Sequence, residues 1–160
     1  FLGSLGKFFR KSSSSFSNNK VSFLIPSKSK VNMIEDLFNN KTVKKVGLSW
    51  RTESKNNREE RSIHLKNFLP ILKIKNFQFI NLQYGDTQKE RNLILKKFGK
   101  KLIYYNSLDY TNDIEGLAAL IFKCDLIITI ANFTAQLAGS LGVPTWVLLP
   151  YSCHWRWFVS

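Results

Sequence analysis

Cysteine, acidic residues and long apolar runs are all scarce in this chain of 160 residues. Its two cysteines, Cys124 and Cys153, match neither a disulfide framework nor the spacing of a metal site. Cys124 lies in an apolar run and is expected to be a buried small hydrophobe. No stretch of about 18 apolar residues is free of charge, so no transmembrane segment is predicted. The cysteine usage favours a reducing compartment, and we expect a cytoplasmic protein.

The deficit of acidic residues leaves a strongly basic chain, with 24 Lys and Arg against 11 Asp and Glu. Sixteen of the basic residues and five of the acidic ones lie in residues 1–75. A basic half is usually a solvated surface and sometimes binds an anionic partner. Nucleic acid is the disfavoured partner, because the chain has no RNA-binding aromatic signature, zinc finger or helix-turn-helix pattern. A small phosphate-bearing ligand fits the same charge with fewer assumptions.

Composition divides the chain into two parts. The first 20 residues are basic and Ser-rich without any period, and a short amphipathic stretch follows at 31–40. We therefore expect 1–41 to be a flexible tail and linker and 42–160 to form one domain. The first residue is Phe1 rather than Met, which we interpret as the start of a fragment or a processed chain.

From residue 44 onward, apolar strands and amphipathic helices alternate. Five strands are expected, at 44–50, 77–84, 101–107, 125–132 and 144–150. Helices are expected between them, at 62–75 with Pro70 as a kink or break, 87–99, 113–124 and 134–142. The last two strands are apolar without alternation, which is typical of strands covered on both faces. This order predicts an α/β fold with a Rossmann-like, doubly wound parallel sheet.

The segment IITIANFTAQLAGSLGVPTWVLLP, residues 127–150, places a helix of small residues between two apolar strands. Small side chains at Ala135, Ala138, Gly139 and Gly142 would let this helix approach the sheet closely. Ligands of such sheets bind beyond the carboxyl ends of the strands, where the strand order reverses. Free N–H groups at residues 133–136 would attract phosphate there. Alternatively, Asn132 or Thr134 is simply a helix cap.

The loop after the first strand, SWRTESKNNREERSIHL, is predicted to face this helix start. It carries four basic residues suited to a diphosphate, namely Arg51, Lys55, Arg58 and Arg61. The loop also contains acidic side chains, so an ordinary solvated loop remains the alternative.

Several motifs in this order resemble the heptosyltransferase-like glycosyltransferase family nine. They include KVGLSWR, NLQYGD, DIEGLAALI, TAQLAGSLGVPTWVLLP and the final WRW. The resemblance covers roughly residues 42–158 and is most similar to the version found at the C-terminus of bacterial tetratricopeptide-repeat proteins. It implies the C-terminal, nucleotide-sugar-binding half of a GT-B glycosyltransferase, with no cofactor and no essential metal. It also implies a missing N-terminal acceptor domain that supplies the catalytic base, and a domain truncated at its C-terminus.

Carried over residue by residue, the resemblance gives a predicted donor site. Its donor- and phosphate-binding residues are Arg51, Lys55, Asn132, Phe133, Thr134, Ala135 and Gln136. Gln83 and Tyr84, at the end of the second strand, match a position near the nucleotide base or ribose. Asp113 is expected to be a helix cap, and no catalytic residue is assigned.

Three positions depart from the family pattern. Ala131, Phe133 and Gln136 stand where relatives commonly have an acidic residue, a small hydroxyl residue and a histidine. Gln136 still donates a hydrogen bond but carries no charge. Two hypotheses therefore stay open: the donor-binding half of a glycosyltransferase that is inactive in isolation, or a degenerate binding or scaffold module. Trp157 is expected to be a core or interface anchor, with stacking on a ligand as the alternative.

Overall fold

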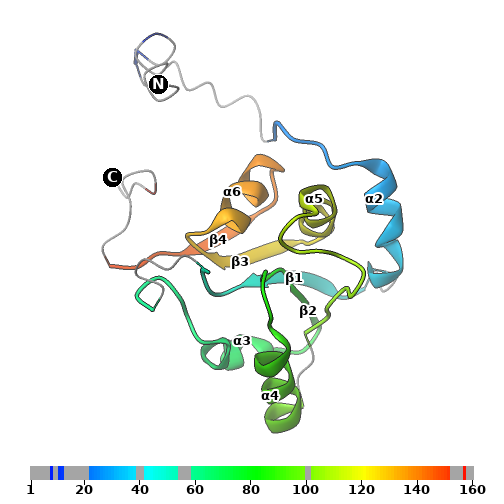
Figure 1. Cartoon of the computed structure of the whole chain (residues 1–160), viewed down its shortest axis with the longest axis vertical. Helices are drawn as coiled ribbons and strands as arrows, with labels where there is room; N and C mark the ends of the chain where they lie inside the picture. The colour runs from blue at the N-terminus through cyan, green and yellow to red at the C-terminus, as the bar shows by residue number, and fades with distance from the viewer. Residues whose placement is uncertain are drawn as a thin grey trace.

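The computed structural model describes residues 8, 11–12, 22–38, 42–53, 59–99, 102–151 and 157. Its centre is a four-stranded parallel sheet with the order β2-β1-β3-β4 (Figure 1). The strands are β1 (Lys44–Ser49), β2 (Phe77–Asn81), β3 (Leu126–Ile130) and β4 (Thr145–Leu148). The first strand of the domain is therefore central, and the α/β class with a doubly wound parallel sheet is confirmed.

Helices cover both faces of the sheet (Figure 1). On one face lie α5 (Ile114–Phe122) and α6 (Phe133–Ser140), with α2 (Lys28–Met33) packed beside α5. The other face carries the 3₁₀ helix η4 (Leu65–Phe68), α3 (Leu69–Leu72) and α4 (Gln88–Phe98). Each face buries its own apolar cluster, so the sheet separates two cores.

Glycine is required in the middle of β1. A Cβ atom built on Gly47 would lie 2.4 Å from Leu82 Cδ1 and 2.7 Å from Ile127 Cδ1. Both contacts are far closer than side-chain carbons tolerate, so the neighbouring residues fill the space that a side chain would need. Gly47 thus lets the β1 backbone lie directly under the apolar cluster of the α5 side.

Small residues in α6 act in different ways. Ala135 and Ala138 are buried, which agrees with a close approach of helix and sheet. Gly139 has open space around it, so packing does not require a glycine there. Gly142 has φ 73° and ends the helix: its N–H donates to Gly139 O at 3.1 Å, and Val143 N–H donates to Ala138 O at 3.0 Å. These bonds form a Schellman motif.

The predicted strand at 101–107 is reduced to one parallel bridge between Ile80 and Ile103. This segment lies at the outer edge of β2, but it leaves the sheet directly afterwards. Tyr110 accounts for the departure: its ring stacks on Tyr104 at 4.9 Å, and its hydroxyl accepts a 3.0 Å bond from Tyr105 N–H. The backbone donor of Tyr105 is thus satisfied by a side chain rather than by a strand.

The prediction that both faces of the last strand are covered is wrong for β4. Its side chains alternate, with Trp146 63% and Leu148 38% exposed. Trp146 is in register with Ile128, which belongs to the cluster on the α3 side. The exposure of Trp146 shows that this face of the edge strand stays open. The prediction holds for β3, where the last four residues are buried.

Helix boundaries follow the sequence signals with one break. The predicted helix at 62–75 divides into η4 and α3, with Pro70 in the first turn of α3, where a proline is tolerated. α4 ends at Gly99, which has φ 61°. The predicted cap is confirmed at Asp113, whose carboxylate accepts a 2.9 Å bond from Gly116 N–H at the start of α5.

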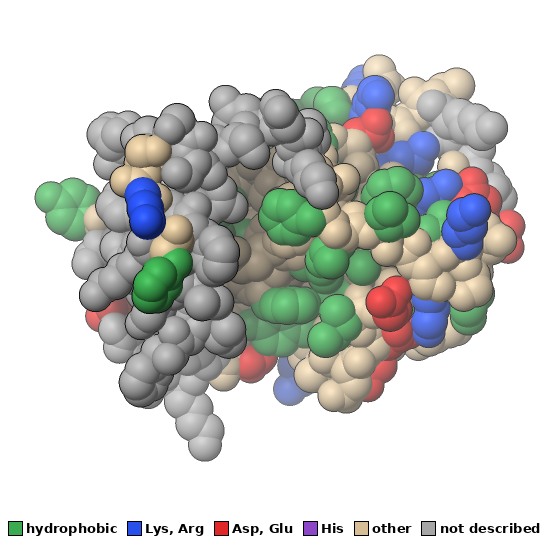
Figure 2. Space-filling model, turned by 90° about the horizontal axis from the view of Figure 1, so that it is seen from above, with side chains coloured by type: hydrophobic (Ala, Val, Ile, Leu, Met, Phe, Trp, Pro, Cys, Tyr) green, Lys and Arg blue, Asp and Glu red, His purple; other side chains and the backbone are tan. Residues whose placement is uncertain are grey.

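Residues 22–38, predicted as part of the tail and linker, pack against the domain. Ile34 and Phe38 are buried in the cluster of the α5 side. Lys30 Nζ forms a 2.7 Å ion pair with Asp113, and Tyr105 Oη donates to Met33 O at 3.2 Å. Figure 2 looks onto this side of the molecule and shows hydrophobic side chains reaching the surface among charged and polar ones.

Two further expectations concern single features of the chain. Cys124 is buried as predicted; its Sγ donates to Leu120 O at 3.3 Å, and burial raises the pKa of its thiol. None of the helices in the described ranges has the length and apolarity needed to cross a membrane.

Candidate functional site

The strand order reverses between β1 and β3, so the crevice at their carboxyl ends is the expected ligand position. Asn132, directly after β3, spans this crevice: its Nδ2 donates to Ser49 Oγ at 2.8 Å. Its Oδ1 accepts from Thr129 Oγ1 at 3.0 Å and from Ala135 N–H at 3.4 Å. Asn132 is therefore the N-cap of α6, and it also ties the helix start to the end of β1.

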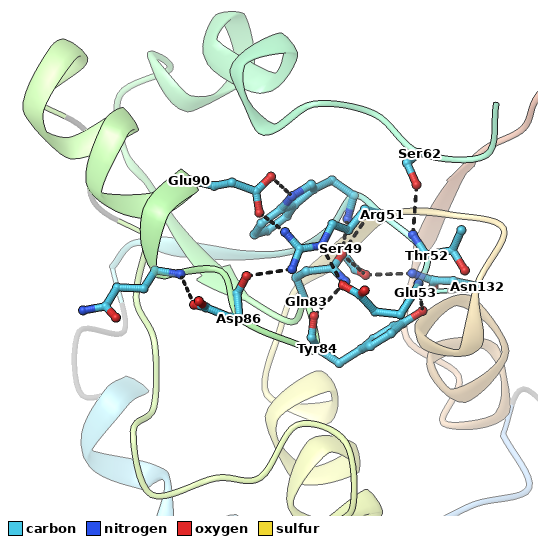
Figure 3. A network of polar contacts seen from close by, with 12 residues as sticks. Ser49, Arg51, Thr52, Glu53, Ser62, Gln83, Tyr84, Asp86, Glu90 and Asn132 are labelled. Carbon is cyan, nitrogen blue, oxygen red and sulfur yellow. Dashed lines mark hydrogen bonds and ion pairs between the residues drawn. The ribbon is translucent and has the colours of Figure 1, made fainter. Parts of the chain in front are cut away.

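Gln83 holds the other side of the crevice. Its fully buried side chain accepts bonds through Oε1 from Ser49 Oγ at 3.2 Å, Trp50 N–H at 2.9 Å and Arg51 N–H at 2.8 Å (Figure 3). Its Nε2 donates to Tyr84 O at 3.1 Å. All the polar groups of this side chain are thus used inside the protein, where they set the path of the loop that leaves β1.

Arg51, the predicted phosphate ligand of that loop, is bound to acidic groups. Its Nε lies 2.9 Å from Glu53 Oε1, its Nη1 pairs with Glu90 Oε2, and its Nη2 donates to Asp86 O at 2.7 Å. Figure 3 shows the guanidinium directed toward Glu90 and Asp86, on the side opposite Asn132. The side chain is 15% exposed, so its charge is neutralised by two carboxylates and largely shielded from solvent.

Arg61 supplies the cationic group that does reach the start of α6. Its Nη2 donates to Ala131 O at 3.2 Å, one residue before the helix cap. A pocket of about 310 Å³ opens at this place. Its described lining residues are Thr52, Arg61, Tyr84, Ala131, Asn132, Phe133, Gln136 and Trp157.

This pocket gathers only part of the predicted set. Asn132, Phe133, Gln136 and Tyr84 line it. The side chains of Thr134 and Ala135 are buried, and the N–H group of Ala135 donates to Asn132, so the N–H group of Thr134 is the contact that these two residues could offer a ligand. Arg51 and the fully buried Gln83 do not line it. Lys55 lies outside the described residues.

The predicted set omits four of the lining residues, namely Thr52, Arg61, Ala131 and Trp157. Arg61 had a signal in the sequence, as one of four basic residues in the loop after β1. Trp157 belongs to an aromatic segment of the sequence, which does not indicate that its side chain lines this pocket. To predict that Arg61 rather than Arg51 reaches the pocket, one must know that Arg51 pairs with acidic residues. One of these, Glu90, lies 39 positions further along the chain.

The chemistry of this pocket is suited to binding an anion with an aromatic or sugar moiety. Positive potential comes from Arg61 and from the N-terminus of α6, whose first-turn N–H groups have no intrahelical acceptors. Tyr84, Trp157 and the half-exposed Phe133 add ring surface. The described lining residues include no Asp, Glu or His, and thus no general acid or base near neutral pH. The residues that the structure describes contain no cluster of His, Cys, Asp or Glu able to hold a metal.

The sheet order and the covering helices give this chain a Rossmann-like fold of the kind found in GT-B glycosyltransferases. The crystal structure of a family 9 glycosyl transferase from Veillonella parvula DSM 2008 superposes with a TM-score of 0.67 at 15% identity, over 85% of this chain and 39% of that one. The E. coli heptosyltransferase WaaC, solved with ADP-2-deoxy-2-fluoro heptose, superposes with a TM-score of 0.50 at 11% identity, over 68% of this chain and 33% of that one. The resemblance read from the sequence motifs is thus confirmed at the level of fold.

A curated relative shares more of the sequence. Protein FlbA of Caulobacter vibrioides is 34% identical over 107 residues, which are 65% of this chain but 18% of FlbA. No protein-family model matches the chain. The chain therefore spans less than a fifth of that relative and well under half of either solved structure.

Proposed function

We propose that this chain is the donor-binding domain of a metal-independent GT-B glycosyltransferase that transfers a sugar from a nucleoside diphosphate to an acceptor. The observation that carries the proposal is the pocket at the start of α6. It combines a helix N-terminus, the Arg61 guanidinium and aromatic side chains at the carboxyl edge of a parallel sheet. This is where ligands of such sheets bind, in a domain whose fold is that of family 9 glycosyltransferases.

In this proposal the diphosphate lies against the first turn of α6. The N–H groups of Phe133 and Thr134 face its oxygens, since that of Ala135 donates to the cap at Asn132, and Arg61 replaces Arg51 as the charged contact. The amide of Gln136 donates a further hydrogen bond. Tyr84 and Trp157 offer rings to the base or sugar, since both line the same pocket. Fixed donors aimed at the departing diphosphate would stabilise its charge without a metal or cofactor.

Gln83 contributes indirectly in this account. It holds the N–H groups of Trp50 and Arg51 and so positions the loop that leads toward Arg61. We therefore assign it a positioning role rather than a contact with the base or ribose. Lys55 remains a predicted phosphate contact from the loop after β1.

The complete enzyme needs parts that lie beyond this domain. The described residues of the pocket offer no base for an acceptor hydroxyl, and we infer that a second, N-terminal domain supplies it. The larger size of the similar proteins agrees with this inference. A tetratricopeptide-repeat context, suggested by the sequence motifs, is part of the same proposal. By itself this domain is expected to bind a donor without turnover.

A second candidate is a degenerate module that keeps the fold for binding or scaffolding. Two observations favour it: the charge of Arg51 is neutralised by Glu53 and Glu90, and the bulky side chain of Phe133 stands half-exposed at the helix start. Restoring Ala131→Asp and Gln136→His distinguishes the candidates. A large gain in donor affinity would show a degenerate site, whereas little change would argue that no family-like site exists.

The direct test is thermal unfolding of the chain with UDP, GDP, ADP, CMP and their sugar conjugates, with pyrophosphate as a control. A ligand at 100 times its dissociation constant adds about 2.7 kcal/mol to the free energy of unfolding. For a domain of this size that raises Tm by roughly 5–10 °C. We expect one nucleoside diphosphate to stabilise the chain selectively.

The Arg61→Ala variant tests the assigned contact. Loss of a charge-assisted hydrogen bond costs about 1.5–3 kcal/mol, which corresponds to roughly 10- to 150-fold weaker binding. Lys96→Ala, on the exposed side of α4, removes a positive charge elsewhere and should leave affinity unchanged. Equal stabilisation by pyrophosphate would show that the start of α6 binds anions without recognising the nucleoside or the sugar. No stabilisation by any compound of the panel would contradict donor binding by this domain.

A further inference from the structure

A second concave surface lies between η4 and the first half of α4. It encloses a cavity of about 270 Å³ and shares no residue with the pocket at α6. Its lining residues are His64, Leu65, Lys66, Lys89, Glu90, Leu93 and Ile94. We call this surface the α4 groove. Leu65 and Ile94 are buried in the core beneath it, while Leu93 is 44% exposed at its side.

The apolar side of α4 is only partly used by the fold. Among its residues Ile94 alone is buried, whereas Leu93, Leu95 and Phe98 are exposed. A helix of a globular protein normally buries a whole apolar stripe. Of these three exposed residues Leu93 lines the cavity, and an exposed apolar side chain beside a recess with a buried floor indicates a binding surface.

The charge at the α4 groove is positive. Its one carboxylate, on Glu90, is compensated internally: Oε1 accepts a 3.0 Å bond from Trp50 Nε1, and Oε2 pairs with Arg51. Lys66 and Lys89 form no ion pair within the ranges that the structure describes. The free charges at the rim are therefore two ammonium groups that flank an apolar cavity.

We propose that the α4 groove binds an acidic segment of a partner protein. A Leu, Ile or Phe side chain of that segment would fill the cavity against Leu93 and Ile94, and neighbouring Asp or Glu side chains would pair with Lys66 and Lys89. Such an apolar anchor with a complementary charged rim is a common form of peptide recognition.

The size and shape of the α4 groove favour this occupant over others. A cavity of about 270 Å³ is just below the roughly 300–1,000 Å³ of small-molecule sites, so it suits one or two side chains. Its apolar floor offers nothing to a nucleic-acid backbone. A lipid surface would contact protruding residues such as Phe98 rather than a recess with a buried floor.

Short fluorescein-labelled peptides with one or two Leu or Phe residues flanked by Glu test the proposal with the full chain. Matched peptides replace Glu by Lys, or the apolar residues by Ser. We expect saturable binding of the Glu-flanked peptides by fluorescence anisotropy. Both replacements should weaken binding at least about tenfold.

Variants of the chain assign the binding to the α4 groove. The double variant Lys66→Glu, Lys89→Glu should bind the Glu-flanked peptides about tenfold or more weakly and should bind the Lys-flanked peptides more tightly than the native chain does. Leu93→Ser, at an exposed position, should weaken binding without any change of charge. Lys28→Glu, at an exposed position of α2 on the other face of the sheet, reverses a charge away from the lining and should alter affinity less than about threefold near 150 mM salt, where charges are screened beyond about 8 Å.

Three results would overturn the proposal. One is the absence of saturable binding by every peptide of the panel up to millimolar concentration. Another is an equal loss in the control variant, which would show a diffuse charge effect. The last is binding to phosphatidylglycerol vesicles that Leu93→Ser weakens while no peptide binds, which would assign the surface to a membrane instead.

Discussion

Replacement of Gln83 by Met removes a buried set of hydrogen bonds while nearly preserving side-chain volume. In the native protein Gln83 Oε1 accepts bonds from Trp50 N–H, Arg51 N–H and Ser49 Oγ. The variant leaves the two backbone donors without an acceptor, each at a cost of about 1–3 kcal/mol. We expect a total destabilisation of about 2–4 kcal/mol, which lowers Tm by roughly 5–15 °C in a domain of this size.

Calorimetry or circular dichroism during heating measures this loss. The matched control is Gln88→Met, which makes the same chemical change at an exposed position of α4 and should stay within about 0.5 kcal/mol of the native chain. Destabilisation of less than about 1 kcal/mol by Gln83→Met would refute the assignment of Gln83 as the residue that holds the loop after β1.

Three further predictions concern the fold. Asp113→Ala should cost about 1 kcal/mol by removing the cap of α5 and its ion pair. The hydrogen bonds from Lys30 and from the backbone N–H of Gly116 lower the pKa of Asp113 in the folded protein. The stability that Asp113 contributes is therefore complete above its unfolded pKa and is lost as pH falls through its folded pKa. The free energy of unfolding of the variant should fall less on acidification than that of the native protein. Gly47→Ala should destabilise by about 1–3 kcal/mol in urea titrations, because its Cβ meets Leu82. Burial raises the pKa of Tyr110 to about 12, so native stability should fall as pH rises from 10 toward 12, and Tyr110→Phe should remove that fall.

The sheet was predictable because its signals are local. Apolar strands that alternate with amphipathic helices predict parallel crossovers, and these give the doubly wound sheet. The two strand errors arise from tertiary context. Tyr110 captures the backbone N–H of Tyr105, and Trp146 lies on a face of the edge strand that stays open.

The candidate site was predictable only in part. The start of α6 and its cap at Asn132 were predictable, because the capping residue and the small residues of the helix follow one another directly in the sequence. The orientation of Arg51 came from Glu90, a residue on another helix, and the loss of Gln83 as a ligand contact came from backbone donors across the crevice. Such pairings depend on register between distant segments, which a single sequence does not show.

Chemical-shift mapping of the ¹⁵N-labelled chain with the stabilising nucleoside diphosphate tests donor binding most directly. We expect saturable shifts of the Phe133 and Thr134 amides and of the Trp157 indole. The dissociation constant obtained from these shifts should rise at least tenfold in Arg61→Ala. Shifts confined to residues outside the pocket at α6, or no saturable shifts with any nucleoside diphosphate, would contradict donor binding at this pocket.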